Sequence, residues 1–410
     1  MLPRITRAVA GFAMTMVVVA PASTRADDGA GVPALDEATF LQRVRERSPR
    51  RAVFDERRHA ADAAVAAAAV LPNPLVFYER EDVASIENSQ DVLRLGWQLD
   101  LAGRRGLARN AARAGAIAER ASVDRDVLLL ELEARTAYLD AVYARARVAQ
   151  LEAARTELAT VATALAERAR QGDASSYDAE RATLELEVLD DERADARRQL
   201  EVARLRLGAL IGEPARGFDA SGSLVLPVRP AGPSALQRPD VDAARARAVQ
   251  ATREATLAGR TWIPKLELVV GVMAQAQQGS SGVGYVVGVG GDLPIFDRGA
   301  AAAAKHRAEA KRWEAEARSL ATEATGEAAQ AREVLVQRIA HAEGYASGPA
   351  ARALDLARRV TLAYREGDRP ILELIDVHRT LRQTAVRALE LVYEARRAEL
   401  ALARAQGRVP

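Results

Sequence analysis

The sequence predicts a mainly α-helical protein with a small β part, built from two copies of one unit. Three observations lead to this fold class: a composition rich in Ala, Leu, Arg and Glu, helical patterns of almost 70 residues, and an internal repeat. The 410 residues include only 6 Phe, 3 Trp and 8 Tyr. Such a composition is unusual for a globular core and is typical of long helices that pack through small residues.

The absence of cysteine and the balanced charge exclude several functions. With Cys 0, the chain has no disulfide framework, no thiolate metal site, no cysteine nucleophile and no lipid-anchored N-terminal cysteine. The formal charge of +2 comes from Arg4 and Arg7, so the rest of the chain is neutral, with both signs interspersed. A neutral surface gives no electrostatic reason to bind nucleic acid, although the sequence pI is about 9.0.

The N-terminus has the pattern of a secretory signal peptide. The basic residues Arg4 and Arg7 precede an apolar stretch at 8–20, and small residues follow it. We expect a signal peptide at 1–22, with a second cleavage option after residue 26. The apolar stretch is shorter than the ~20 residues of a membrane-spanning helix, and no later segment is expected to form one. A membrane role would therefore depend on β-strands.

The chain contains an internal duplication. Matching landmarks recur at offsets of 190 to 195 residues: Pro74 and Pro264, Arg104 and Arg298, Gly172 and Gly367, Gly212 and Gly407. The repeats are expected at 35–212 and 234–407, with a Pro/Gly-rich linker at 213–233. Each repeat has the same order: a helix of about 25 to 35 residues, two strands, a very long helix, a Gly-Asp turn and another long helix.

Alternating residues indicate the strands. In the first repeat Leu93, Leu95, Trp97, Leu99 and Leu101 share one face, and in the second Val283, Tyr285, Val287 and Val289 do so. Their partners are a partly regular segment at 75–80 and a regular one around 266–272. Strands of about 9 to 11 residues suit a tilted membrane-spanning strand, and Trp97 and Trp262 stand where aromatic girdles lie. On the strands alone, a small soluble sheet is the simpler interpretation.

The helical segments are exceptionally long. The pattern at 298–366 would span roughly 100 Å, with kinks expected only at Gly344 and at Gly348-Pro349. The equivalent stretch of the first repeat is 104–171. A coiled-coil seam is expected at Leu374, Val377, Leu381, Ala385, Ala388, Val392 and Ala395.

Closure of the sheet requires more than one chain if the strands span a membrane. Four strands cannot close into a barrel, and an open edge leaves backbone polar groups unpaired in lipid. Two copies would supply eight strands and three would supply twelve, and the residues do not choose between them.

With these features in place, the chain resembles the TolC family of outer-membrane efflux proteins over essentially its whole mature length. The most specific marks are the repeated motifs RARQGDASSYD at 168–178 and AYREGDRPILELID at 363–376, supported by LPNP at 71–74 and LPIFDR at 293–298. The segment LAGRRG at 101–106 is most similar to the cobalt-zinc-cadmium efflux branch of that family.

The resemblance implies a homotrimer with a shared twelve-strand barrel in outer-membrane lipid, continuous with a periplasmic α-helical tube. It also implies two partners, a periplasmic adaptor protein and an inner-membrane pump of the RND type. The chain would then be a passive conduit from periplasm to exterior, with heavy-metal cations as the cargo of the branch named above.

The resemblance also assigns roles to the helix tips. Tyr177, Asp178, Tyr364, Arg369, Glu373 and Asp376 fall on the periplasmic gate, and Gly172, Asp173, Gly367 and Asp368 fall on tips that contact the adaptor. The expected gate links are Tyr364 to Asp178 and Arg369 to Tyr177, each worth about 1 kcal/mol because a gate must reopen. Asp376, with Glu373, would form acidic rings that favour cations. The family commonly has an apolar residue after the tip glycine, where this chain has aspartate.

No enzyme is expected, because the sequence has no G-x-S-x-G, G-x-G-x-x-G, P-loop or H-E-x-x-H motif. The histidines His59, His306, His341 and His378 are each expected alone on a helix, without a second metal ligand three or four residues away. They are interpreted as helix positions rather than metal ligands, so no metal site and no cofactor are expected. The alternative to a channel is a soluble periplasmic coiled-coil adaptor or chaperone with a small capping sheet. An adaptor should carry a β-rich module between its helices, and no such module is recognised.

Overall fold

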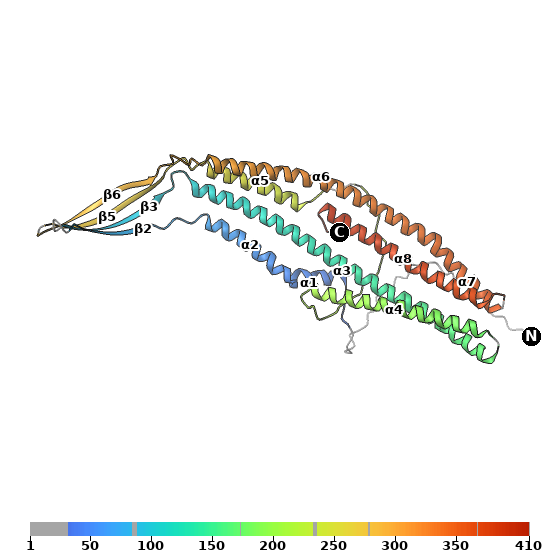
Figure 1. Cartoon of the computed structure of the whole chain (residues 1–410). Coiled ribbons are helices and arrows are strands. Elements are labelled where there is room, and N and C mark those ends of the chain that lie inside the picture. The colour runs from blue at the N-terminus through green and yellow to red at the C-terminus, as the bar shows by residue number, and fades with distance from the viewer. Residues whose placement is uncertain are drawn as a thin grey trace, which may run out of the picture.

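The computed structural model describes residues 32–83, 88–172, 174–232, 236–277, 279–366 and 368–409. The expected signal peptide lies outside these residues. The described chain is a long, curved rod with a β-sheet at one end and long helices along the rest (Figure 1). The prediction of a mainly helical protein with a small β part is confirmed.

The elements follow the expected order in both halves. The first half contains β1 (Ala34–Leu35), α1 (Glu37–Arg47), α2 (Pro49–Ala67), β2 (Leu75–Val83), β3 (Asn88–Leu99), α3 (Arg104–Gln171) and α4 (Ser176–Leu210). The second contains β4 (Asp219–Ala220), α5 (Pro239–Ala258), β5 (Lys265–Gln277), β6 (Ser280–Asp292), α6 (Ala300–Tyr345), the π-helical turn η2 (Ala346–Ala350), α7 (Ala351–Glu366) and α8 (Ile371–Gln406).

The helix before the strands is shorter than expected in both halves. In the first half Ser48 separates α1 from α2, because the residue before Pro49 is pushed out of the helical region. In the second half α5 has only 20 residues. The linker also contains an element that the sequence did not indicate, since β4 pairs in parallel with β1.

One four-stranded sheet joins the two halves. Its strand order is β2-β3-β5-β6, and every pair is antiparallel. The central pair, β3 with β5, links the first half to the second, with Leu95 opposite Val270. The strands at the two edges, β2 and β6, each pair on one side only.

The long helices differ between the two halves. The first half has one unbroken helix, α3, of 68 residues. The second half is interrupted by η2, which contains Pro349. Proline lacks the backbone N–H of a helix interior, and a π-helical turn accommodates that loss. The break expected at Gly348-Pro349 is therefore confirmed, whereas the helix continues through Gly344.

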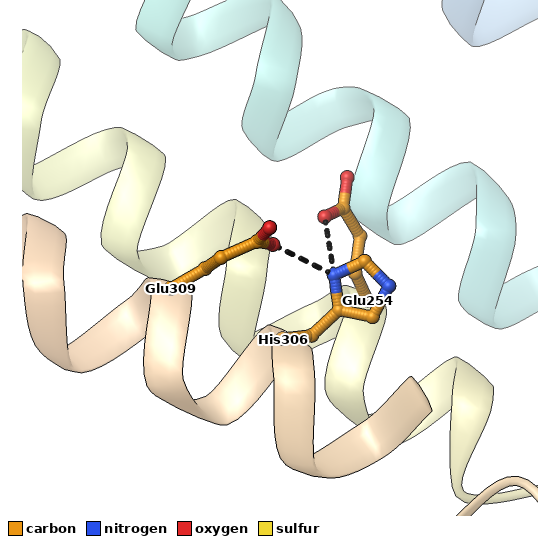
Figure 2. A group of neighbouring side chains, drawn as sticks. All are labelled: Glu254, His306 and Glu309. Atoms are coloured by element: carbon orange, nitrogen blue, oxygen red, sulfur yellow. Dashed lines mark hydrogen bonds and ion pairs between the residues drawn. The ribbon is translucent and has the colours of Figure 1, made fainter. Parts of the chain in front are cut away.

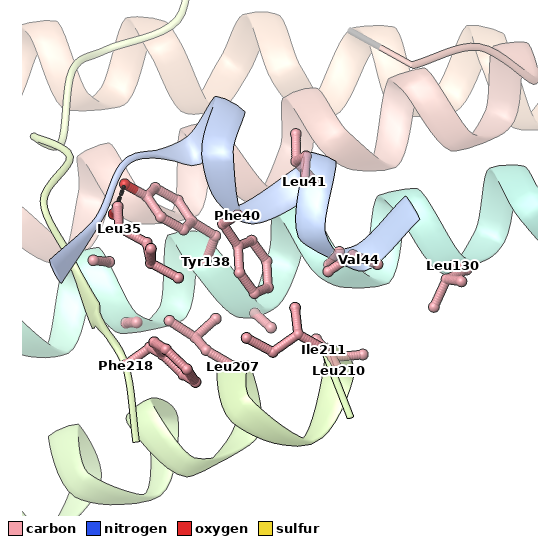
Figure 3. Packing of buried hydrophobic residues seen from close by; sticks show 14 of the residues in the cluster. Leu35, Phe40, Leu41, Val44, Leu130, Tyr138, Leu207, Leu210, Ile211 and Phe218 are labelled. Atoms are coloured by element: carbon pink, nitrogen blue, oxygen red, sulfur yellow. Dashed lines mark hydrogen bonds between the residues drawn. The ribbon is translucent and has the colours of Figure 1, made fainter. Parts of the chain in front are cut away.

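The largest apolar core among the described residues lies midway along the rod, where α1 packs (Figure 1), and Figure 3 shows it from close by. It joins α1, α3, the end of α4, and the short strands β1 and β4. The rings of Phe40 and Tyr138 stack at 5.8 Å. The Tyr138 hydroxyl donates to the carbonyl of Leu35 at 3.0 Å and accepts from the N–H of Gly222 at 3.0 Å. This core fixes the chain's linker against α3.

The buried face of α8 differs in part from the expected seam. Leu374, Val377 and Ala395 are buried as expected. Leu381 and Val392 are only half-buried, and Arg382 and Leu391 take the buried positions in the middle of the helix. A straight helix drifts by about 20° per heptad from a strict 3.5-residue repeat, which moves the buried stripe sideways.

Candidate functional site

The sheet carries exposed apolar side chains on one face. Residues that pair across strands share a face, which here unites Leu95, Val270 and Val287. On β6, Val287 is 68% exposed and Tyr285 is 84% exposed. A soluble protein seldom exposes so large an apolar patch, so this face requires a covering that the single chain does not supply.

The opposite face is built of small and polar residues. In β6 it presents Gly282, Gly284, Val286, Gly288 and Gly290, and in β5 it presents Lys265, Glu267, Val269, Gly271, Met273 and Gln275. In β2 the alternation of apolar and polar residues is less regular, because Leu75 and Phe77 fall on this face. The alternation therefore holds best in β3, β5 and β6.

The sheet meets the helices at a junction marked by aromatic and basic residues. Trp97 and Trp262 are both about half exposed there, at 50% and 57%. Arg104, the first residue of α3, donates to the carbonyl of Arg260 at 3.0 Å and also to that of Ile263. This contact ties the start of α3 to the end of α5. None of the described helices combines the length and the apolar character needed to cross a membrane.

At the far end of the rod, two helix hairpins form the tips. Gly172 ends α3 with φ of 82°, a left-handed conformation that glycine adopts without strain. Ser175 then caps α4, its hydroxyl accepting from the N–H of Tyr177 at 3.2 Å. In the second hairpin the N–H of Asp368 donates to the carbonyl of Ala363 at 2.9 Å. Asp173 and Gly367 lie outside the described residues.

The two hairpins pack against each other through an apolar tip cluster. Its buried members are Ala162, Leu165, Ala182, Ile371, Leu374 and Ile375. The half-buried ring of Tyr364 packs on its edge. The tips of the two halves are thus one packed unit within the chain.

The residues expected at the gate lie at this end, but not in the expected pairs. Tyr364 accepts a hydrogen bond from Arg168 at 3.4 Å, and Arg369 pairs with Glu373 at 3.1 Å. Tyr177, which is 60% exposed, accepts from Arg181 at 3.4 Å.

Neither Tyr364 with Asp178 nor Arg369 with Tyr177 is joined within the described part of one chain. The partners are local: Tyr177 and Arg181 are four residues apart on one face of α4, and Arg369, just before α8, reaches Glu373 in the first turn of that helix. Glu373 and Asp376, the residues expected in the acidic rings, are exposed.

A buried charge network behind the tip was missed in the sequence. Glu185 on α4 and Arg382 on α8 are both less than a tenth exposed. Arg379 donates from Nε to Glu185 Oε1 at 2.9 Å, and Arg382 pairs with Glu192 at 2.6 Å. The hydrogen bond from Arg379 lowers the pKa of Glu185 below its ordinary value. The sequence feature that could have indicated this network is Arg382, which directly follows Leu381 of the expected apolar seam.

A cavity of about 310 Å³ adjoins this network. It lies between α3, α4, η2 and α8, and its lining includes Leu189, Ala350, Arg382 and His378. His378, expected as a surface helix position, is only 24% exposed, with Nδ1 at 3.5 Å from Glu157. The incomplete packing is therefore next to the π-helical turn, where α6 gives way to α7.

Comparison with known proteins identifies the fold. No family model matches the sequence, and no curated protein matches it either. Solved structures do match, including CusC, described for its transmembrane channel formation, at TM-score 0.76 and 18% identity over 94% of this chain and 96% of that one.

Two other matches also span nearly the whole chain. The Campylobacter jejuni CmeC outer membrane channel matches at TM-score 0.76 and 15% identity, over 99% of this chain and 94% of that one. The open state of the Neisseria gonorrhoeae MtrE outer membrane channel matches at TM-score 0.71 and 20% identity, over 91% and 89%. The chain therefore has the fold of TolC-like outer-membrane efflux channels.

Proposed function

We propose that this chain is the outer-membrane channel component of a tripartite efflux system, a passive conduit from the periplasm to the exterior. The observation that carries the proposal is the sheet, whose apolar face is exposed at the end of a rod roughly 100 Å in helical length. Such an apolar face is stable in contact with lipid. The fold shared with outer-membrane channels supports the same function.

Closure of the sheet requires several chains, and the family resemblance implies a homotrimer. The edge strands β2 and β6 leave backbone groups unpaired in one chain, and these groups must be paired within a membrane. Three chains would give a twelve-strand barrel, with α3, α4, α6, α7 and α8 forming the periplasmic tube. The repeats 35–212 and 234–407 would each supply half of a protomer's wall.

The tips would form the gate and the docking site. Tyr177, Asp178, Tyr364 and Arg369 would hold the tube closed, and Asp376 with Glu373 would place acidic rings at the opening. Gly172, Asp173, Gly367 and Asp368 would meet a periplasmic adaptor, which in turn would connect to an inner-membrane pump of the RND type. Heavy-metal cations are the proposed cargo, in keeping with the sequence resemblance to the cobalt-zinc-cadmium branch.

Conductance tests the channel directly. Purified full-length protein added to planar bilayers is expected to give discrete current steps, with Arg369→Ser increasing the conducting fraction. An Arg359→Ala variant, which removes an exposed ion pair with Asp355 and none of the residues expected at the gate, serves as the matched control. Bilayers that stay silent with protein recovered from the soluble periplasm would instead favour the adaptor or chaperone.

The cargo needs a separate test. Cells lacking the gene are expected to become more sensitive to zinc, cobalt or cadmium salts and to regain resistance when it is returned. An unchanged sensitivity to metals, with altered sensitivity to organic compounds, would overturn the metal assignment and leave the channel intact.

A further inference from the structure

A histidine and two glutamates converge below the sheet (Figure 2). Glu254 belongs to α5, and His306 and Glu309 belong to α6. The Nδ1 atom of His306 lies 3.3 Å from Oε2 of Glu254 and 3.0 Å from Oε2 of Glu309. The sequence-based expectation that no histidine has metal-ligand neighbours is wrong here, because Glu309 follows three residues after His306 and α5 supplies the third group.

The spacing of these atoms suits a small divalent cation. Zinc bonds of about 2.0–2.2 Å at tetrahedral angles place neighbouring ligand atoms about 3.3–3.5 Å apart. The two observed distances are close to that range. A single Nδ1 carries at most one proton and donates one hydrogen bond, so one imidazole nitrogen does not fully satisfy two carboxylates.

The remaining oxygens of the two glutamates are directed away from the imidazole by neighbours. Gln250 donates from Nε2 to Oε1 of Glu254 at 2.9 Å, and Lys305 Nζ lies 3.9 Å from Oε1 of Glu309. These contacts leave one oxygen of each glutamate beside His306. Outer contacts of this kind orient metal ligands in known sites.

The cluster belongs to the second repeat alone. At the offset of 190 residues, Ala64 stands in the place of Glu254, and residues 104–115 at the start of α3 contain no His, Asp or Glu. The shared architecture of the two halves therefore does not require these three side chains. Among the described residues, this is the one group of three or more such ligands close enough to share an ion.

We propose that Glu254, His306 and Glu309 form a binding site for a divalent transition-metal cation of the zinc type, one ion per chain. One imidazole and two carboxylates suit Zn²⁺, Co²⁺ or Ni²⁺ better than Mg²⁺ or Ca²⁺, which prefer oxygen ligands throughout. The side chains are 25% to 38% exposed, which leaves access for the ion and for a water ligand. The ion would clamp α5 to α6 about two turns below the sheet. The site goes beyond the proposed channel and does not depend on the cargo.

The test is a titration of Zn²⁺ into purified full-length protein that has been stripped with a chelator, followed by calorimetry. The wild type is expected to bind one ion per chain. His306→Ala and Glu254→Gln are each expected to weaken that binding at least ~10-fold. The matched control is His59→Ala, because His59 and Glu56 form an exposed pair on α2 with 3.7 Å between them and no third ligand.

Two results would overturn the site. One is the absence of saturable zinc binding, which would leave His306 as an ion-pair partner only. The other is binding that survives both His306→Ala and Glu254→Gln. The circular dichroism and oligomeric mass of each variant show whether it has folded, and X-ray absorption of the bound zinc should report one nitrogen ligand with oxygens. Conductance measured on the same metal-free protein separates failure of the site from failure of the channel.

Discussion

The two ends of the rod are packed in opposite ways. At the sheet end Val287 and Tyr285 point outward and are exposed, whereas at the tip end Leu374 and Ile375 point inward and are buried. The exposed residues Glu373 and Asp376 place charge on the surface of the tip. Under the proposed function, these two opposite arrangements match two surroundings, lipid at the sheet and water at the tip.

The largest predicted effect comes from charging the apolar face of the sheet. Val287→Arg is expected to abolish membrane assembly, because an arginine facing lipid costs about 2–4 kcal/mol at the midplane and recurs in every copy. Val286→Arg is the matched control, since its side chain lies on the opposite face of the same strand. The measurement is the membrane-inserted fraction of each variant. Equal membrane insertion of both variants would show that the apolar face of the sheet does not face lipid.

The next effect is expected at the tip, from the buried charge network. Glu185→Leu would remove the carboxylate shared by Arg379 and Arg382, while Arg382 would keep its pair with Glu192, so a loss of about 1–3 kcal/mol is expected. Hydrogen exchange of α4 and α8 is expected to accelerate in this variant, whereas the exposed-pair variant Arg359→Ala should exchange like the wild type. Unchanged exchange in Glu185→Leu would show that α4 and α8 are held by apolar contacts alone.

The same network predicts how the tip responds to pH. Because the pKa of Glu185 is lowered in the folded chain, its ionised form stabilises the tip above its unfolded pKa of about 4.3. That contribution declines once the pH falls below the unfolded value and is fully lost when the pH has fallen through the lowered value. Protease cleavage at the tips should therefore stay constant down to about pH 5 and rise below about pH 4. In Glu185→Gln this additional rise should be smaller, and an identical rise would assign it to other groups.

A smaller effect is expected from removing the π-helical turn. Deletion of Pro349 would remove the extra residue that the π-helical turn accommodates, so α6 and α7 would become one continuous α-helix in nearly the same phase. Ala353 and Ala357 would then stay on their buried face, and the stability should change by no more than about 1 kcal/mol. Limited proteolysis near 366–370 should therefore proceed as in the wild type. Accelerated digestion would mean that the turn itself sets the position of α7.

A similarly small effect concerns the gate hydroxyl. Tyr364→Phe removes the hydrogen bond from Arg168 and keeps the ring in the tip cluster, a loss of about 1 kcal/mol. The open fraction in planar bilayers is expected to rise by a few-fold. Tyr177→Phe tests the corresponding hydroxyl of the other hairpin. An equal rise in the open fraction for both variants would show that both hairpins contribute to keeping the channel closed.

The main elements could be predicted because each has a local cause. Glycine at both ends fixed the limits of α3, Pro349 interrupted the second long helix, and alternation marked β3 and β6. The short strands β1 and β4 were missed, since a two-residue strand has no periodicity. The split at Ser48 depended on a single proline.

The side-chain partners could not be predicted in the same way. Pairing of Glu185 with Arg379 and of His306 with Glu254 depends on which helices become neighbours, and sequence spacing does not encode that. The expected link between Tyr364 and Asp178 came from family resemblance, whereas the chain places Arg168 at that hydroxyl. The spacing of His306 and Glu309 was visible in the sequence, but it indicates a three-residue cluster only once α5 places Glu254 next to them.

The most direct test of the central claim is the mass of the complex in the outer membrane. Cells expressing the full-length chain would be fractionated, and the outer-membrane fraction would be extracted in mild detergent for mass determination. The account predicts a complex of three chains in that fraction. Recovery of the chain as a soluble periplasmic monomer or dimer would contradict it.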